Sequence, residues 1–262
     1  MPDLNGLADL AEDVARAASE LLRSGMSRRG GTVTTKTSAT DMVTEMDTEA
    51  EELIVSRLAE ARPDDSILAE EGGGRTGTSP VRWVIDPLDG TTNYLYGDPR
   101  YGVSIAAEID EETVAAVVAD PSLHEVFRAV KGGGAFLNGE PITHSDHDDL
   151  ATALIATGFS YLPDERARQA KVLTHVLPKV RDIRRHGSAA LDLCWAACGR
   201  VDGYYEVTLQ PWDIAAGILV ASEAGCLVCG VDGGPPSSAS VLAAAPQLGP
   251  ALLRLLADAG AP

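Results

Sequence analysis

The sequence predicts a mixed α and β protein made of two halves, an α+β half over residues 1–147 and an α/β half over residues 148–262. In the first half, short apolar runs follow one another between polar turns, whereas strand-like and helix-like runs alternate in the second half. The chain has 262 residues, of which 45% are hydrophobic, so it can bury a large core. The polar run at 143–150 is the best candidate for the boundary between the halves.

The first half begins with two predicted helices, over residues 4–22 and 48–61, because their apolar residues recur at helical spacing. Four predicted strands follow, separated by short polar or Gly/Pro turns, at 83–85, 101–107, 113–119 and 126–130. The Gly-rich stretch at 131–142 lacks the Gly-Lys-Ser/Thr ending of a phosphate-binding loop, and its Asn138 and Gly139 are typical of a hairpin turn. We therefore expect an antiparallel sheet with both helices packed on it.

The second half alternates between strands and helices. We expect strands at 153–157 and 203–207, further strands near 227 and 241, and helices within 164–180, over 188–198 and over 212–224. Gly199 and Gly225 stand where two of these helices should end, a position that favours glycine. This order is typical of an α/β unit.

The charge of the chain excludes several classes of partner. The 21 Lys and Arg against 39 Asp and Glu give a formal net charge of −18, so the overall field repels nucleic acid and anionic lipid. The N-terminus lacks a basic segment followed by an apolar one, and no apolar run approaches the roughly 20 residues of a membrane span. We therefore expect a cytoplasmic protein with neither a nucleic-acid nor a membrane partner.

Cys226 and Cys229 form a Cys-x-x-Cys pair, which in principle suggests zinc or redox chemistry. Leu227 and Val228 between them favour a buried strand instead, and no His lies nearby in the sequence. Four cysteines in a chain of this length do not make a disulfide scaffold.

The stretch at 83–97 begins as an apolar strand and then places two carboxylates, Asp86 and Asp89, at the exit of the strand. Buried unpaired carboxylates are costly. Pro87 stiffens the bend between them, and Gly90 permits a tight turn. Carboxylates next to a phosphate repel it unless a divalent cation lies between them, and oxygen ligands without Cys or His favour Mg²⁺ or Mn²⁺ over zinc. The stretch therefore predicts a metal site on a rigid strand, the alternative being an ordinary turn.

Other polar residues could complete such a site. Thr91 and Thr92 follow the turn with hydroxyls and backbone N–H groups at the start of a short helix, an arrangement that can hold a phosphate. Glu70 follows another short apolar run, and Asp213 opens an amphipathic helix. Taken alone, Glu70 is typical of a solvated loop and Asp213 of a helix cap.

Together, these segments resemble the inositol monophosphatase family of Mg²⁺-dependent, lithium-sensitive phosphomonoesterases. The three signature-like segments lie at 70–73, 83–97 and 211–217, and similarity at 36–47, 132–142 and 184–206 extends the resemblance over nearly the whole chain. The resemblance implies a layered α-β-α-β-α sandwich of the inositol monophosphatase and fructose-1,6-bisphosphatase type. It also implies a homodimer.

Position by position, the resemblance implies a cluster of several Mg²⁺ ions held by Glu70, Asp86, the backbone carbonyl of Leu88, Asp89 and Asp213. Gly90 and Thr91 would bind phosphate through backbone N–H groups. Thr91, hydrogen-bonded by Asp47, would help Glu70 orient and deprotonate a metal-bound water. Lys36 would lie near the site. Such a cluster positions the water, neutralises the phosphoryl oxygens and stabilises the leaving alkoxide, so the carboxylates act as ligands and not as nucleophiles.

The resemblance places substrate recognition in the second half. Gly187, Ser188 and Ala189 would start a helix next to the site, Asp213 would also contact the substrate, and Glu206 would bind sugar or inositol hydroxyls. Ser188 has an alternative reading as a helix N-cap, and Glu206 as an exposed strand residue. A carboxylate that contacts neighbouring hydroxyls favours a polyol, which indicates inositol 1-phosphate as the substrate.

Related proteins on this scaffold act on histidinol phosphate, fructose 1,6-bisphosphate and 3′-phosphoadenosine 5′-phosphate. The charge of −18 disfavours doubly phosphorylated substrates, although Arg184 and Arg185 weaken that argument. Histidinol phosphate carries its own cation and is the closest enzymatic alternative. A non-enzymatic alternative is a binding partner of the transcription machinery, as some bacterial relatives are, but a complete ligand set favours retained catalysis.

Overall fold

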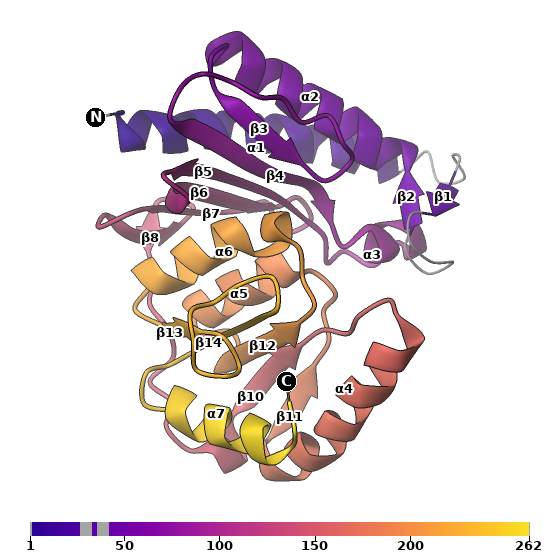
Figure 1. Cartoon of the computed structure of the whole chain (residues 1–262), viewed down its shortest axis with the longest axis vertical. Helices are drawn as coiled ribbons and strands as arrows, with labels where there is room; N and C mark the ends of the chain where they lie inside the picture. Colours follow the sequence, from indigo (N-terminus) through magenta and orange to yellow (C-terminus); the bar gives the residue numbers. More distant parts are fainter. Residues whose placement is uncertain (1, 27–32, 36–41, 262) are drawn as a thin grey trace.

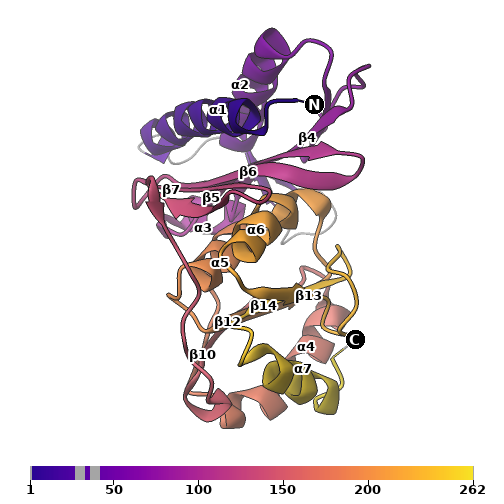
Figure 2. The same cartoon turned by 90° about the vertical axis from the view of Figure 1, so that its left-hand side faces the viewer.

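The computed structural model describes residues 2–26, 33–35 and 42–261. Within these ranges, five layers are stacked along the long axis: two helices, a seven-stranded sheet, two helices, a five-stranded sheet and two more helices (Figure 1). A view at right angles shows the same order of layers (Figure 2). The layered α-β-α-β-α sandwich predicted from the sequence is therefore confirmed.

The first sheet has the strand order β3-β4-β5-β6-β7-β8-β9. Its strands are β3 (Ser66–Ala69), β4 (Val81–Asp89), β5 (Gly102–Ile109), β6 (Glu112–Asp120), β7 (Glu125–Val130), β8 (Gly134–Leu137) and β9 (Glu140–Pro141). All neighbours are antiparallel except β3 and β4, which are parallel because the segment at 70–80 returns to the start of β4. This parallel edge pair corrects the expectation of a purely antiparallel sheet.

Two helices, α1 (Leu4–Gly25) and α2 (Glu45–Ala61), cover the outer face of this sheet (Figure 1). The side chains of β4 alternate between two cores: Trp83 and Ile85 pack with these helices, whereas Val84 packs with the helices of the middle layer. A strand that is buried on both faces explains the continuous apolar run in the sequence.

The second helix starts earlier than the residue 48 predicted from the sequence. Thr44 is its N-cap: the Thr44 hydroxyl accepts from the backbone N–H of Met46, and the Asp47 carboxylate accepts from the backbone N–H of Thr44 at 2.8 Å. This capping box ties the preceding short sheet, formed by β1 (Val33–Thr35) and β2 (Met42–Thr44), to the helix.

The second sheet has the strand order β11-β10-β12-β14-β13. Its strands are β10 (Leu154–Thr157), β11 (Asp182–Arg184), β12 (Gly203–Val207), β13 (Leu227–Cys229) and β14 (Ser240–Ala244). Strand β10 is parallel to both of its neighbours, and β14 is antiparallel to both of its own. The mixed sheet follows from the alternation of strands and helices in this half of the sequence.

Helices α5 (Ala189–Ala197) and α6 (Pro211–Glu223) lie between the two sheets, and α4 (Pro163–Val176) and α7 (Gly249–Asp258) cover the outer face of the second sheet (Figures 1 and 2). Nearly all residues of α5 and most of those of α6 are buried. A helix that is apolar on all sides requires such a position between two layers.

Most predicted elements are confirmed with shifts of a few residues at their ends. The hairpin turn is also confirmed, because Leu137 pairs with Glu140 across Asn138 and Gly139, whose φ angles are 51° and 84°. Strands β3, with four residues, and β11, with three, were not predicted as strands. Helix α7 was also not predicted, although its buried leucines have helical spacing.

The cysteine pair lies where a strand was expected. Cys229 ends β13, all four cysteines are free thiols, and burial raises the pKa of Cys226 to about 12. A thiol with so high a pKa is a poor nucleophile and a poor metal ligand, which agrees with a structural role.

The polar run at 143–150 connects the two sheets: β9 ends at Pro141, and β10 starts at Leu154. Helix α6 of the second half nevertheless packs directly on the first sheet, so the division into domains at 147 stays a prediction. None of the helices in the described part of the chain is long and apolar enough to cross a membrane.

Candidate active site

A cavity of about 480 Å³ lies where the two halves meet, and both halves contribute to its walls. Its lining includes the predicted site residues Glu70, Asp86, Leu88, Asp89, Gly90, Thr91, Gly187, Ala189, Glu206 and Asp213. Residues more than a hundred positions apart in the sequence are thus gathered around one space.

The parallel pairing of β3 and β4 brings the first two carboxylates together. Ala69 is paired with Ile85, so Glu70 and Asp86 follow directly at the same edge of the sheet. Asp86 is 2% exposed, and its pKa is raised well above the ordinary value by burial and then by the charges of Glu70, Asp89 and Asp213. Glu70 and Asp86 also share a side-chain hydrogen bond.

The end of β4 is shaped by an irregularity in its pairing with β5, between Asp86 and Asp89. Pro87, which has no backbone N–H to offer the neighbouring strand, sits in this irregular stretch. Asp86 accepts a hydrogen bond from the backbone N–H of Leu88 at 3.0 Å. The side chains at the strand end are therefore fixed by local backbone geometry.

Asp89 connects the two halves of the protein. One of its oxygens, Oδ2, accepts from the Ser188 hydroxyl at 2.7 Å and from the backbone N–H of Ala190 at 2.8 Å, at the start of α5. Burial raises the pKa of Asp89 to about 7, although these two hydrogen bonds oppose the shift. The other carboxylates, Glu70 and Asp192, act in the same direction as burial.

Asp213 comes from the first turn of α6, which starts at Pro211. Its Oδ2 accepts from the backbone N–H of Gln210 at 2.7 Å, so Asp213 is a helix-capping residue as well as a cavity residue. Its pKa is raised well above the ordinary value, first by burial and then by the charge of Asp89.

The residues present fit a site for hard divalent cations. Glu70, Asp86, Asp89 and Asp213 lie on one wall, and burial together with the neighbouring carboxylates raises the pKa values of the three aspartates. Bound cations would offset the repulsion between these like charges. In the described ranges, no three His, Cys, Asp or Glu side chains already converge closely enough to hold a metal ion. All the candidate ligand atoms are oxygens, the type that Mg²⁺ and Mn²⁺ prefer.

The predicted hydrogen bond between Thr91 and Asp47 is present. The Thr91 hydroxyl lies 2.8 Å from Asp47 Oδ1 and 3.2 Å from the carbonyl oxygen of Leu88. Asp47 is buried behind Thr91 and does not line the cavity. Gly90 has φ 95° and is the N-cap of α3 (Thr91–Tyr96), so a glycine is required where the turn enters the helix.

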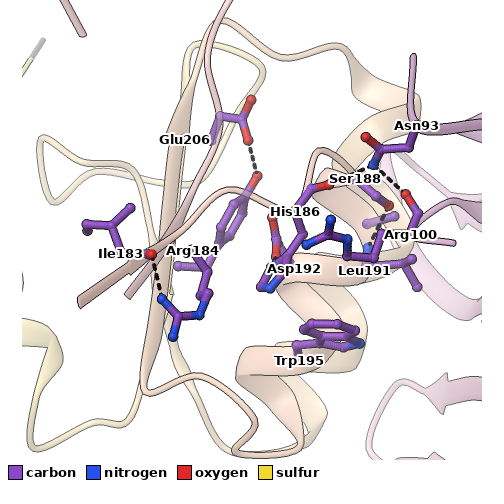
Figure 3. Close-up of polar contacts among 12 residues, drawn as sticks. Asn93, Arg100, Ile183, Arg184, His186, Ser188, Leu191, Asp192, Trp195 and Glu206 are labelled. Carbon is purple, nitrogen blue, oxygen red and sulfur yellow. Dashed lines mark hydrogen bonds and ion pairs between the residues drawn. The ribbon is translucent and has the colours of Figure 1, made fainter. Parts of the chain in front are cut away.

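The second-half wall is built from the start of α5 and from β12. Glu206 is half-buried in this wall, and the Tyr204 hydroxyl donates a hydrogen bond to its Oε2 at 2.8 Å (Figure 3). Burial raises the pKa of Glu206 to about 8. Glu206 is thus a cavity carboxylate and not the exposed strand residue of the alternative reading.

Ser188 is the N-cap of α5, as the alternative reading of the sequence had it. Its hydroxyl accepts from the backbone N–H of Leu191 at 3.3 Å, donates to Asp89, and does not line the cavity, unlike Gly187 and Ala189 on either side. Its connection to the site therefore runs through Asp89.

Sequence reasoning missed several cavity residues. Gly158 lies against Glu206, since a Cβ on this glycine would come within 1.9 Å of a Glu206 oxygen. Arg185, named only as a possible phosphate-binding cation, is the one cationic side chain among the described residues that line the cavity. Tyr161 and Trp212 add aromatic surface. These residues are recognised only from long-range contacts, which the sequence does not show. Lys36, which was expected near the site, lies outside the described residues.

Comparison with known proteins agrees with this fold. The model of the inositol monophosphatase family matches residues 3–261. The chain belongs to the inositol monophosphatase family, and with it to the phosphoric monoester hydrolases.

Named relatives carry two kinds of description. The inositol-1-monophosphatase SuhB of Mycobacterium tuberculosis strain H37Rv is 48% identical over 240 residues, which cover 85% of this chain and 83% of that protein. The Nus factor SuhB of Pasteurella multocida is 41% identical over 249 residues, which cover 94% of this chain and 93% of that protein.

Solved structures of similar proteins superpose over nearly the full length. The extragenic suppressor protein SuhB of Bartonella henselae has a TM-score of 0.92 at 37% identity, over 96% of this chain and 98% of that one. The SuhB structure of Mycobacterium tuberculosis has a TM-score of 0.86 at 42% identity, over 100% of this chain and 99% of that one.

Proposed function

We propose that the protein hydrolyses inositol 1-phosphate to inositol and phosphate, with Mg²⁺ as the cofactor and Mn²⁺ as a substitute. The observation that carries this proposal is the convergence of Glu70, Asp86, Asp89 and Asp213 on one cavity wall next to the turn at Gly90. The relatives named inositol-1-monophosphatase support the same substrate.

In this proposal the cations are held by the four carboxylates and the carbonyl of Leu88. Bound divalent cations neutralise phosphoryl charge and acidify water, which is the chemistry that hydrolysis of a phosphate monoester requires. The backbone N–H groups of Gly90 and Thr91 orient the phosphate. Glu70, with the Thr91 hydroxyl that Asp47 holds, accepts the proton of the attacking water.

Recognition of the alcohol is assigned to the opposite wall. The Glu206 carboxylate accepts hydrogen bonds from neighbouring substrate hydroxyls, and Gly187 and Ala189 leave room for the ring because their side chains are absent or small. Histidinol phosphate is the closest alternative substrate, since its ammonium group would suit the acidic cavity. Fructose 1,6-bisphosphate and 3′-phosphoadenosine 5′-phosphate rank lower in a cavity with one cationic side chain among its described lining residues.

The proposal is tested by a phosphate-release panel with these four esters, each with and without Mg²⁺. We expect the highest kcat/KM for inositol 1-phosphate and no turnover without the cation. We also expect Li⁺ to inhibit at millimolar concentrations, as the family resemblance implies, with a dependence on Mg²⁺ concentration that shows competition. Preference for histidinol phosphate would move the assignment to the alternative substrate, and Mg²⁺-independent turnover would refute the metal mechanism.

A second candidate role is a partnership with the transcription machinery, favoured by relatives that are named Nus factor SuhB. Because the chain carries a net charge of −18, such a partner is a protein and not a nucleic acid.

We further propose a homodimer in the cytoplasm, where four free thiols are stable. Light scattering tests the dimer, and co-purification with RNA polymerase subunits tests the partnership separately from phosphate release.

A further inference from the structure

Asn93 joins three segments of the chain next to the cavity. It lies on α3, and its Nδ2 donates hydrogen bonds to the backbone carbonyl oxygens of Arg100 at 2.5 Å and of His186 at 2.6 Å (Figure 3). The first carbonyl belongs to the loop before β5, and the second to the loop before α5. One carboxamide thus holds loops from both halves of the protein.

The backbones around Asn93 are packed closely, with two glycines facing each other. A Cβ on Gly90 would lie 3.0 Å from the Arg100 carbonyl oxygen and 3.1 Å from that of Gly187. A Cβ on Gly187 would lie 3.0 Å from Asn93 Nδ2. Both glycines have φ of 90° or more in the left-handed region, so neither position tolerates a side chain. The backbone of the turn at Gly90 thus contacts the backbones of both loops, and the Asn93 carboxamide bridges these loops.

The loop before α5 is also held at His186 itself, through the side chain of this residue. His186 Nδ1 lies 2.5 Å from Asp192 Oδ1, and the His186 ring stacks edge-on against Trp195 with a centroid distance of 4.4 Å (Figure 3). These contacts attach the loop to α5, within the second half. The hydrogen bonds of Asn93 set where this rigid unit stands relative to α3.

The two sides of this contact carry different parts of the proposed site. Gly90 and Thr91 lie on the side assigned to phosphate, and Gly187 and Ala189 lie on the side assigned to the alcohol. A phosphate ester with several hydroxyls must reach both sides at once. An ester with a plain aromatic alcohol has no hydroxyls to place on the second side.

We propose that Asn93 is a positioning residue that sets the spacing between the phosphate-binding turn and the hydroxyl-binding wall, and so favours polyol phosphates over esters without hydroxyls. The inference rests on the proposed function. It adds a specificity role to a residue that does not line the cavity.

The test compares kcat/KM for inositol 1-phosphate and for 4-nitrophenyl phosphate in Asn93→Leu and Asn93→Ala. Leucine keeps the branched shape but removes both donors, and alanine removes the side chain. We expect the ratio of the two kcat/KM values to fall at least about tenfold, because a displacement of about 1 Å between binding groups costs rates of that order or more. The ratio is independent of the fraction of folded enzyme, because both substrates are measured on the same preparation.

The matched control is Asn138→Ala. Asn138 also has a carboxamide that bridges two backbone groups, with Oδ1 accepting from Val126 N–H at 2.9 Å and Nδ2 donating to the His124 carbonyl at 3.3 Å, in a hairpin that does not line the cavity. This variant should lose stability but keep the ratio of the parent.

Three outcomes would overturn the inference: an unchanged ratio in both Asn93 variants, a ratio that falls equally in the Asn138 control, or no folded protein from either Asn93 variant. The last would make Asn93 a residue of the fold alone. If the parent hydrolyses neither ester, the proposed function fails, and the inference fails with it. If the parent is active and only the ratio fails to change, the proposed function stands and the role of Asn93 is refuted.

Discussion

The two walls of the cavity bury carboxylates in opposite ways. On the wall formed by β3, β4 and α6, Asp86, Asp89 and Asp213 face one another and Glu70, and burial together with their mutual repulsion raises their pKa values. On the wall formed by α5 and β12, Glu206 stands with a neutral hydroxyl donor, Tyr204, 2.8 Å from its oxygen. The first wall gathers several negative charges, whereas the second holds one carboxyl that a neutral donor supports.

The walls also differ in how rigidly the backbone holds their carboxylates. Asp86 and Asp89 end a nine-residue strand that is buried on both faces, and Asp89 is bonded to the start of α5. Glu206 lies on a five-residue strand and occupies space that exists because Gly158 has no side chain. The difference suggests that phosphate hydrolysis depends on the rigid first wall. Recognition of the substrate alcohol depends on the second wall, which small substitutions can reshape.

The largest effect is expected at the first wall. Asp89→Asn and Asp213→Asn should each lower kcat at least about a hundredfold at saturating Mg²⁺, because in the proposed function the lost charge would hold cations that stabilise the transition state. Steady-state kinetics with thermal melts measure both turnover and folding. The control is Asp232→Asn, an exposed carboxylate that does not line the cavity, and it should keep full turnover. Near-normal turnover in Asp89→Asn would remove this residue from the ligand set.

A smaller and more selective effect is expected at the second wall. Above about pH 8, where the Glu206 carboxyl is ionised, Glu206→Gln keeps the size of the side chain but loses a charged acceptor. The cost is roughly 1.5–3 kcal/mol if the substrate hydroxyls bind there. The loss should appear in kcat/KM for inositol 1-phosphate, while an aryl phosphate is hydrolysed almost as well as by the parent. Equal losses on both substrates would place Glu206 in the catalytic machinery and erase the contrast between the walls.

The charge crowding predicts an unusual pH dependence of stability without cations. Burial raises the pKa of Asp89 to about 7 and that of Glu206 to about 8. Carboxyls whose pKa is higher in the folded state stabilise it below their unfolded pKa, and that contribution is lost as pH rises through about 7 to 8. The melting temperature of cation-free protein should therefore fall between about pH 5.5 and pH 8.5, by at least the roughly 2–4 °C that 1 kcal/mol represents in a chain of this size.

Added Mg²⁺ should raise the melting temperature most at the upper end of this pH range, because the ionised carboxylates bind the cation. Differential scanning calorimetry with chelator and with Mg²⁺ measures both arms. Asp89→Asn should flatten the pH dependence. A cation-free melting temperature that rises steadily over the same range would contradict the assigned charge crowding.

The smallest effect is expected at a residue that supports the first wall without lining the cavity. Glu51, buried on α2, accepts hydrogen bonds from the backbone N–H groups of Glu71 at 2.6 Å and Gly73 at 2.7 Å, and so holds the loop that carries Glu70. Glu51→Gln should cost about 1–3 kcal/mol of unfolding free energy, because glutamine has one acceptor oxygen for two donors. It should also weaken Mg²⁺ activation, while the exposed neighbour variant Glu52→Gln should leave both unchanged.

The helices and strands of the sandwich could largely be predicted from the sequence, because long apolar runs and their spacing report burial. The candidate ligands Glu70, Asp86, Asp89 and Asp213 could be named from their motifs. Their arrangement could not, since the adjacency of Glu70 and Asp86 depends on the parallel register of a four-residue strand that was not predicted. Long-range contacts leave no local pattern in the sequence.

The second wall was harder to predict for the same reason. Ser188 has a good N-cap signature, and the structure confirms that reading, but its bond to Asp89 spans 99 positions. Tyr204 could have been found as the partner of Glu206, because residues two apart on a strand share a face. Gly158 could not have been found in this way. Its side chain must be absent because Glu206, on a strand that lies far along the chain, occupies that space.

The position of α5 and α6 between the sheets has a consequence for how the chain is made. The inner face of the seven-stranded sheet, with Val84, Ala106, Ala116 and Phe127, is covered by helices that lie at 189–223, after the sheet in the sequence. A ribosome that adds roughly 5–20 residues per second exposes this apolar face for several seconds before its cover emerges. The nascent chain is therefore most prone to aggregate when its first sheet is complete and its middle layer is still unsynthesised.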